Sequence, residues 1–150
     1  MRIVVQRTSG AEVWIDGACH AQTGPGLLLL VGTQEGDTIE SARYLADKVV
    51  NLRIFEDDAG KMNLSVLETG GEMMVVSQFT LYADTKKGRR PSFNGAQNPT
   101  DAEPLYEEFI QLLRASGLTV KSGVFGAVMQ VRFTNSGPVT IILDHDLPAA

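Results

Sequence analysis

The sequence predicts an α+β protein in which strands dominate and two helices cover one or more mixed sheets. Short apolar runs bounded by turn residues, two segments with helical spacing, and an ordinary globular composition support this prediction. The chain has 150 residues, of which 43% are hydrophobic and 21% charged. This length fits one domain with a single core. We find no repeat, low-complexity tract or linker, so we expect one domain over residues 1–150.

Apolar and β-branched residues predict strands in several segments. Residues 1–8 and 11–16 indicate two strands, with Ser9-Gly10 as a hairpin turn. Gly24-Pro25-Gly26 opens the continuous apolar run Leu27–Val31, which is typical of a strand buried on both faces. The other predicted strands cover residues 52–55, 62–66, 72–82, 118–120, 127–133 and 139–143, with 72–82 as the central strand.

Two segments have the periodicity of amphipathic helices. The first begins around Asp37-Thr38-Ile39-Glu40, where an acceptor side chain precedes an acidic first turn, and it ends near residue 50. Its apolar stripe consists of Ile39, Ala42, Leu45, Ala46, Val49 and Val50. The second begins at Asp101-Ala102-Glu103-Pro104 and ends near Ser116-Gly117. Its apolar stripe consists of Leu105, Phe109, Leu112 and Leu113.

The composition excludes several classes of site. The single cysteine, Cys19, rules out an intramolecular disulfide, and with only His20 and His145 there is no Cys/His spacing for structural zinc. Asp144-His145-Asp146 contains metal-ligand residue types, but adjacent residues rarely converge on one ion. We therefore expect no metal and no cofactor. No apolar run approaches the roughly 20 residues of a membrane span, and the start resembles a strand more than a signal peptide, so we expect a cytoplasmic protein without a membrane partner.

Positive charge is concentrated in one segment of an acidic chain. The net charge is −5, yet Lys86, Lys87, Arg89 and Arg90 hold four of the thirteen basic residues within five positions. An isolated basic segment is commonly a solvated loop. Because this one follows soon after the polar segment Ser77–Thr80, contact with an anion such as phosphate is the second interpretation.

Polar residues stand where the central strand is expected to continue. Ser77-Gln78-Phe79-Thr80 follows the apolar run Met73–Val76, and a buried polar atom without a partner costs about 1–3 kcal/mol. Hydroxyls can act as nucleophiles, and amides or backbone N–H groups can stabilise an oxyanion, which indicates acyl chemistry. No histidine or lysine lies nearby in sequence to activate Thr80, so a conventional triad is not supported. Cross-strand hydrogen bonding remains the structural alternative.

A second segment also departs from what a strand needs. Asn135-Ser136-Gly137-Pro138 separates two strand-like runs, and proline inside a strand removes a donor from the ladder. Two such departures in one chain indicate a functional site.

These segments resemble the signatures of the D-aminoacyl-tRNA deacylase family, and the resemblance extends from Met1 to about Leu143. The family has an SQFTL-type segment and an NxGPVT-type segment, present here as Ser77–Leu81 and Asn135–Thr140. Lys87–Phe93 and Gly123–Ala127 add further similarity. The resemblance implies a barrel-like core for the predicted sheets.

The resemblance also implies an activity: hydrolysis of the ester that joins a D-amino acid to the 3′-terminal adenosine of tRNA, with glycine on tRNA as a second substrate. It implies a homodimer in which Gly137-Pro138 of one subunit, with a cis peptide bond, enters the pocket of the other. An L side chain would collide with fixed backbone atoms there, whereas hydrogen would fit.

The family resemblance assigns further roles. The backbone N–H groups around Phe79 and Thr80, aided by Ser77 and Gln78, would hold the substrate and the oxyanion, while the ribose 2′-hydroxyl directs water. Thr80 as a covalent nucleophile is the competing mechanism. The residues expected to bind adenosine or tRNA are Phe125, Gly126, Met129 and Asn135 together with Lys86, Lys87, Arg89 and Arg90.

Two other functions stay open at this point. A related deacylase with a trans Gly-Pro bond would clear small L-amino acids, and a non-catalytic module would bind RNA or DNA through the basic loop.

Overall fold

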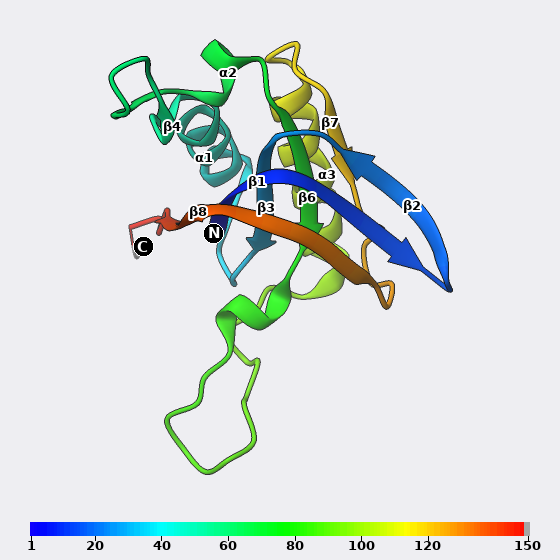
Figure 1. Ribbon diagram of the computed structural model, residues 1–150. Coiled ribbons are helices and arrows are strands. Elements are labelled where there is room, and N and C mark those ends of the chain that lie inside the picture. Colours follow the sequence, from blue (N-terminus) through cyan, green and yellow to red (C-terminus); the bar gives the residue numbers. More distant parts are fainter. Residues whose placement is uncertain (149–150) are drawn as a thin grey trace.

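The computed structural model describes residues 1–148, and its main feature is a curved six-stranded mixed sheet with helices on one face (Figure 1). The elements in chain order are β1 (Arg2–Ile15), β2 (Ala18–Thr23), β3 (Gly26–Gly32), α1 (Ile39–Asn51), β4 (Phe55–Glu56), β5 (Met62–Leu64), α2 (Val66–Thr69), β6 (Glu72–Ser77), the 3-10 turn η1 (Phe79–Tyr82), α3 (Pro99–Arg114), β7 (Val120–Ser122) and β8 (Gln130–Asp144).

Strand β1 organises the sheet because it is long enough to pair with three partners. Its first half pairs antiparallel with β3, its second half with β2, and β8 pairs along its other side. From β3 the sheet continues through parallel pairings to β6 and then β7. The free edges of β2 and β7 lie side by side, so the sheet nearly closes on itself (Figure 1). This confirms the predicted strand-dominated, barrel-like α+β fold.

Helices α1 and α3 cover one face of the sheet and form the main core with it. Thr38 caps α1, its hydroxyl accepting from the backbone N–H of Glu40 at 3.3 Å. Helix α3 begins at Pro99, two residues before the predicted start, because Asn98 caps it and proline is well tolerated in the first turn. The face of α3 that packs into the core consists of Ala102, Leu105, Tyr106, Phe109, Ile110 and Leu113. A smaller core cluster lies on the opposite face of the sheet.

Two predicted breaks in strands were wrong. Ser9-Gly10 is not a turn, because β1 runs through it; the hairpin turn lies at Asp16-Gly17, where φ values of 50° and 77° match a type I′ turn. Residues 127–133 and 139–143 are not two strands either. Strand β8 continues through Gly137-Pro138, and its pairing register with β1 shifts there, which accommodates the proline.

Several predicted strand boundaries were also wrong. The central strand ends at Ser77 instead of residue 82, and the chain then forms η1. The segment 62–66 contributes only β5, since Ser65 caps the short additional helix α2 in a capping box. Of the strand predicted over 52–55 only Phe55 lies in a strand, β4; residues 52–54 are in no strand, and the carbonyl of Ile54 accepts from Arg7 instead. The strand predicted over 118–120 lies at β7.

Among the described residues, no helix combines the length and the apolar character needed to cross a bilayer.

Gly26 should be the least replaceable glycine of the β3–β6 pairing. A Cβ at Gly26 would lie 1.9 Å from the backbone oxygen of Glu72, whereas a Cβ at Gly95 would meet nothing within 4 Å. We expect Gly26→Ala to lower the free energy of unfolding by more than about 3 kcal/mol, since backbone atoms must move apart. Gly95→Ala should stay within about 0.5 kcal/mol. Urea titrations measure both; equal midpoints for the two variants would contradict this assignment.

Two buried phenols should make stability depend on alkaline pH. Burial raises the pKa of Tyr106, and burial together with the carboxylate of Asp37 raises the pKa of Tyr82. Above about pH 10 the unfolded chain loses phenolic protons that the folded protein keeps, so the free energy of unfolding falls as pH rises. We expect the free energy of unfolding of the Tyr106→Phe variant to fall less steeply between pH 9 and about 11. Tyr44→Phe, which removes a 48% exposed phenol, is the matched control in urea titrations.

Candidate functional site

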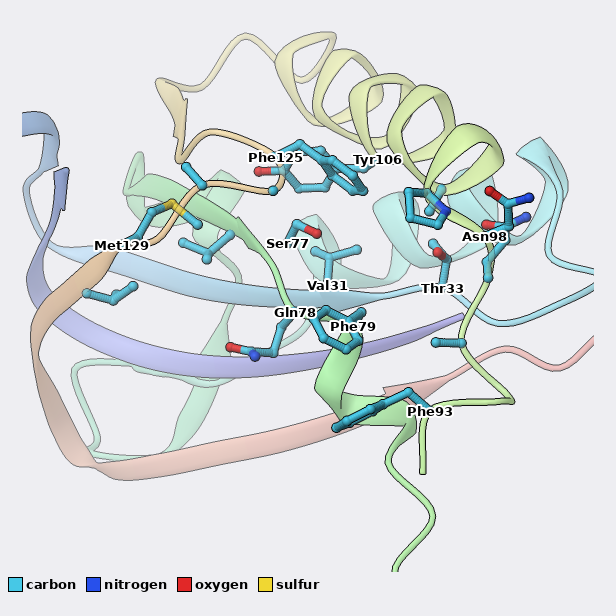
Figure 2. A pocket seen from close by; sticks show the side chains of 18 residues that line it. Val31, Thr33, Ser77, Gln78, Phe79, Phe93, Asn98, Tyr106, Phe125 and Met129 are labelled. Carbon is cyan, nitrogen blue, oxygen red and sulfur yellow. The ribbon is translucent and has the colours of Figure 1, made fainter. Parts of the chain in front are cut away.

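A cavity of about 620 Å³ opens where β6 ends (Figure 2). Segments that are distant in sequence form its walls: the end of β3, the β6–η1 junction, the segment leading into α3 with the first half of that helix, and the loop between β7 and β8 with the start of β8. The lining residues are Val31, Thr33, Val76, Ser77, Gln78, Phe79, Phe93, Ala96, Gln97, Asn98, Pro99, Ala102, Tyr106, Phe125, Gly126, Ala127, Met129 and Val131.

The β6–η1 junction presents backbone donors beside this cavity. The N–H of Gln78 donates to the carbonyl of Val31 at 2.7 Å, which is the last bond between β6 and β3. In η1 the first i→i−3 bond runs from Leu81 N to Gln78 O, so the N–H groups of Phe79 and Thr80 precede it and have no partner within the turn. Such N–H groups can donate to an anionic oxygen.

The side chains of this junction have separate environments. Ser77 and Gln78 line the cavity, and the Gln78 side-chain amide donates to the hydroxyl of Thr80, which lies outside the cavity lining. Phe79 is 56% exposed and meets Phe93 edge-to-face, with 5.0 Å between ring centroids. The two rings form an apolar rim beside the cavity (Figure 2).

Tyr106 supports two walls of the cavity from α3. Its hydroxyl donates to the carbonyl of Val75 at 3.0 Å, and its ring packs against Phe125 with centroids 5.9 Å apart. The N–H of Gly123 donates to the same Val75 carbonyl, also at 3.0 Å. Strand β6, helix α3 and the loop after β7 are therefore tied together at one carbonyl oxygen.

Among residues 1–148, no charged or histidine side chain lines the cavity. The two histidines of the chain lie elsewhere, and the described residues contain no cluster of three or more His, Cys, Asp or Glu side chains that could hold a metal ion. Within the described part of the chain, a side-chain general base therefore has no candidate in this cavity. The polar groups that the described lining offers are backbone groups, amide side chains and the hydroxyls of Thr33, Ser77 and Tyr106.

The structure brings six of the predicted site residues into the cavity. They are Ser77, Gln78, Phe79, Phe125, Gly126 and Met129. Thr80 stands just behind the junction. The basic residues Lys86, Lys87, Arg89 and Arg90 lie on an exposed loop closed by the bridge between Asp84 and Ser92, and none of them lines the cavity.

The predicted Gly137-Pro138 element also lies outside the cavity of its own chain. Both residues are exposed on β8, and the peptide bond between them is cis. Arg7 donates through Nε to the carbonyl of Ser136 and through Nη1 to that of Ile54, each at 2.8 Å.

Asn135 also holds the Gly137-Pro138 segment in place, through hydrogen bonds inside β8. Its side-chain amide donates to the carbonyl of Val139 at 3.1 Å and accepts from the Val139 N–H at 2.7 Å. The structure thus gives Asn135 contacts within its own segment, and Asn135 does not line the cavity.

Sequence reasoning missed several lining residues. Tyr106 is buried on α3 but was not in the predicted apolar stripe, Gln97 lies in a segment rich in Gly and Asn, and Phe93 was noted only for its similarity to the family. The one available signal was the placement of a phenol between core residues, since a buried tyrosine hydroxyl needs a partner.

Comparisons with known proteins agree over nearly the whole chain. The family model "D-Tyr-tRNA(Tyr) deacylase" matches residues 4–144. The chain is 57% identical over 144 residues to a D-aminoacyl-tRNA deacylase of Bacillus velezensis, covering 96% of this chain and 98% of that one. It is 56% identical over 144 residues to a D-aminoacyl-tRNA deacylase of Thermomicrobium roseum, covering 96% and 94%.

Solved structures share the fold. One, described as "c-Myc DNA Unwinding Element Binding Protein", has a TM-score of 0.92 and 39% identity, covering 98% of this chain and all of that one. Another, described as a probable eukaryotic D-amino acid tRNA deacylase, has a TM-score of 0.84 at 19% identity, covering 96% and 98%. With a family model matching most of its length and curated relatives above half identity, this chain belongs to the D-Tyr-tRNA(Tyr) deacylase family.

Proposed function

We propose that this protein hydrolyses the ester bond between a D-amino acid and the 3′-terminal adenosine of tRNA, with glycine on tRNA as a second substrate. Family membership makes it a hydrolase of aminoacyl-tRNA. The observation that carries the proposal is the uncharged cavity beside two free backbone donors, those of Phe79 and Thr80. An aminoacyl ester is already activated, so it needs oxyanion stabilisation more than a strong base.

In this proposal the ester carbonyl points at the N–H groups of Phe79 and Thr80. Ser77 and Gln78 hold the substrate from the adjoining wall, and the 2′-hydroxyl of the terminal ribose directs the attacking water. Adenine would stack on Phe125 and contact Met129, because an aromatic face is the common support for a splayed base. The basic loop from Lys86 to Arg90 would approach phosphates of the tRNA.

A covalent mechanism through Thr80 has less support. The Thr80 hydroxyl accepts from the amide of Gln78, stands outside the cavity lining, and has no histidine or lysine from the lining to deprotonate it. The amide contact holds the hydroxyl beside the two donor N–H groups, which suits a positioning role.

We further propose that Gly137-Pro138 selects for handedness in the pocket of a second copy of the chain. The segment is exposed, lies away from its own cavity, and is held by Arg7 and Asn135. A braced main chain placed beside the substrate Cα would collide with an L side chain but would admit hydrogen. Discrimination would then depend on backbone position and not on the identity of the amino acid.

The DNA-related name of one structural relative keeps a non-catalytic nucleic-acid module as the second candidate. A deacylase that clears small L-amino acids is the third. Mixing the protein with D-tyrosyl-tRNA, L-tyrosyl-tRNA and L-alanyl-tRNA separates the three. We expect rapid release of D-tyrosine alone; protection of all three esters would favour the binding module, and release of alanine would favour the third candidate.

Replacing Thr80 by alanine tests the mechanism. We expect Thr80→Ala to lower kcat about 10- to 100-fold, which is the scale of losing a positioning contact and less than the loss of a nucleophile. Acid quench during turnover of the unaltered protein should trap no acyl-enzyme. A trapped acyl group together with complete inactivity of Thr80→Ala would establish Thr80 as the nucleophile instead.

Loosening the Gly137-Pro138 segment should weaken discrimination between D- and L-tyrosyl-tRNA more than it lowers the turnover of D-tyrosyl-tRNA. Arg7→Ala removes two hydrogen bonds, to Ser136 and Ile54, and we expect the ratio of kcat/KM for D- over L-tyrosyl-tRNA to fall about tenfold, equivalent to about 1.4 kcal/mol. Arg53→Ala, which removes an exposed contact to the carbonyl of Asn63, is the matched control. An unchanged ratio in a folded Arg7→Ala protein would remove the proposed role of the segment.

A further inference from the structure

A second hollow of about 500 Å³ lies where the sheet fails to close. The free edges of β2 and β7 flank it, and the end of α3 completes it. Its lining consists of Cys19, His20, Ala21, Gln22, Arg114, Lys121 and Ser122. Neither its position nor its residues belong to the machinery described above.

This hollow is positively charged in an otherwise acidic chain. The exposed cations Arg114 and Lys121 line it together with the exposed His20, and the described residues contribute no carboxylate to the lining, whereas the whole chain has a net charge of −5. The Arg114 guanidinium is fixed by donating to the carbonyl of Val120 at 3.3 Å and 3.4 Å. Two cationic side chains with no carboxylate in the described lining suit a polyanionic ligand.

The hollow adjoins one particular end of the candidate active site. Ser122 lines the hollow, and the next residue, Gly123, lies directly under Met129: a Cβ on Gly123 would be 2.5 Å from the Met129 sulfur. Met129 and Asn98 mark opposite ends of the cavity (Figure 2). The hollow therefore continues the surface beyond the Met129 end, where the proposed function puts the adenine.

The way in which the amino acid is attached to the tRNA determines the direction in which the tRNA leaves the cavity. The amino acid is attached to the 3′-terminal adenosine, so every phosphate of the tRNA lies on the 5′ side of the adenosine. If adenine occupies the Phe125–Met129 end, the preceding phosphates leave the cavity beside Ser122 and Gly123. The basic loop from Lys86 to Arg90 projects from η1, away from β2 and β7 (Figure 1), and so is in a different direction.

We propose that this hollow, through Lys121, Arg114 and His20, binds the phosphate backbone of the 3′ single strand of tRNA. The inference rests on the proposed function and names the second contact of the same substrate. It makes Lys121 a binding residue that distinguishes a full tRNA from its terminal nucleoside, since only the former carries phosphates. The basic loop would then contact a more distant part of the tRNA.

Kinetics with two substrates test the proposal. Lys121→Glu should raise KM for D-tyrosyl-tRNA about three- to tenfold with little change in kcat. The negative slope of log(kcat/KM) against log salt should become shallower by about 0.7, the value for one phosphate contact of a single strand. The loss on D-tyrosyl-adenosine, which has no phosphate, should be much smaller. Lys61→Glu makes the same charge change in the turn between β4 and β5, and it should leave KM and kcat unchanged for both substrates.

The outcomes separate the two proposals. The deacylase proposal stands if the unaltered protein hydrolyses both substrates. In that case the second contact is wrong if Lys121→Glu has the same kinetics as Lys61→Glu, or if it lowers kcat/KM equally for both substrates. If the unaltered protein hydrolyses neither ester, the deacylase proposal is wrong.

A binding measurement tests the hollow without catalysis. Cys19 is the single cysteine of the chain and is exposed in the lining, so maleimide labelling reports on this place alone. A saturating tRNA that carries D-tyrosine through an amide bond should slow labelling at least about fivefold at low salt, and the effect should vanish at high salt. D-tyrosyl-adenosine with the same amide bond should not protect Cys19. Equal labelling rates with and without the tRNA would overturn the proposal.

Discussion

The hydrogen bond from the N–H of Gln78 to the carbonyl of Val31 sets where the parallel pairing of β3 and β6 stops, and the site depends on that position. One residue later the chain turns into η1, which leaves the N–H groups of Phe79 and Thr80 without intrahelical partners. The carboxyl ends of parallel strands are a common place for ligands, because loops there can diverge and leave a crevice. Here the crevice is walled by α3 and by the loop after β7.

An uncharged cavity determines what kind of selectivity the protein can have. With no charged side chain in the lining, neither a positively nor a negatively charged amino acid gains a partner there. In the proposed function, recognition would then come from shape and from the adenosine and phosphates that all aminoacyl-tRNAs share. Positive charge lies outside the cavity, in the basic loop and beside β7, where under the same proposal it would act on the nucleic acid and not on the reacting ester.

Local rules predicted the elements whose signals are local. The helix α1 and the buried strand β3 lie where periodicity and apolar runs indicated, because capping by Thr38 and burial on both faces are encoded within a few residues. The sequence did not reveal that β1 passes through Ser9-Gly10 or that β8 passes through Gly137-Pro138, because pairing between β1 and β8 overrides these breakers.

The candidate site was predictable only in part for the same reason. Ser77 and Gln78 were found because polar residues after an apolar run break a local pattern, whereas Phe125 was found only through the family resemblance. Tyr106 was not found, because a helix position gives no sign of which carbonyl its hydroxyl will reach across 31 residues. The basic hollow was not found either, since Arg114 and Lys121 meet His20 only when the two sheet edges approach each other.

Pairing of β8 with β1 has a consequence for synthesis on the ribosome. The first strand to emerge is held on one side by β3, but its other edge stays open until the final strand has left the exit tunnel. The segment that carries Gly137-Pro138 and its hydrogen bond from Arg7 therefore form only after β8 has been synthesised. Until then this edge of β1 presents unpaired N–H and C=O groups, and such an edge can pair with the strand of another chain.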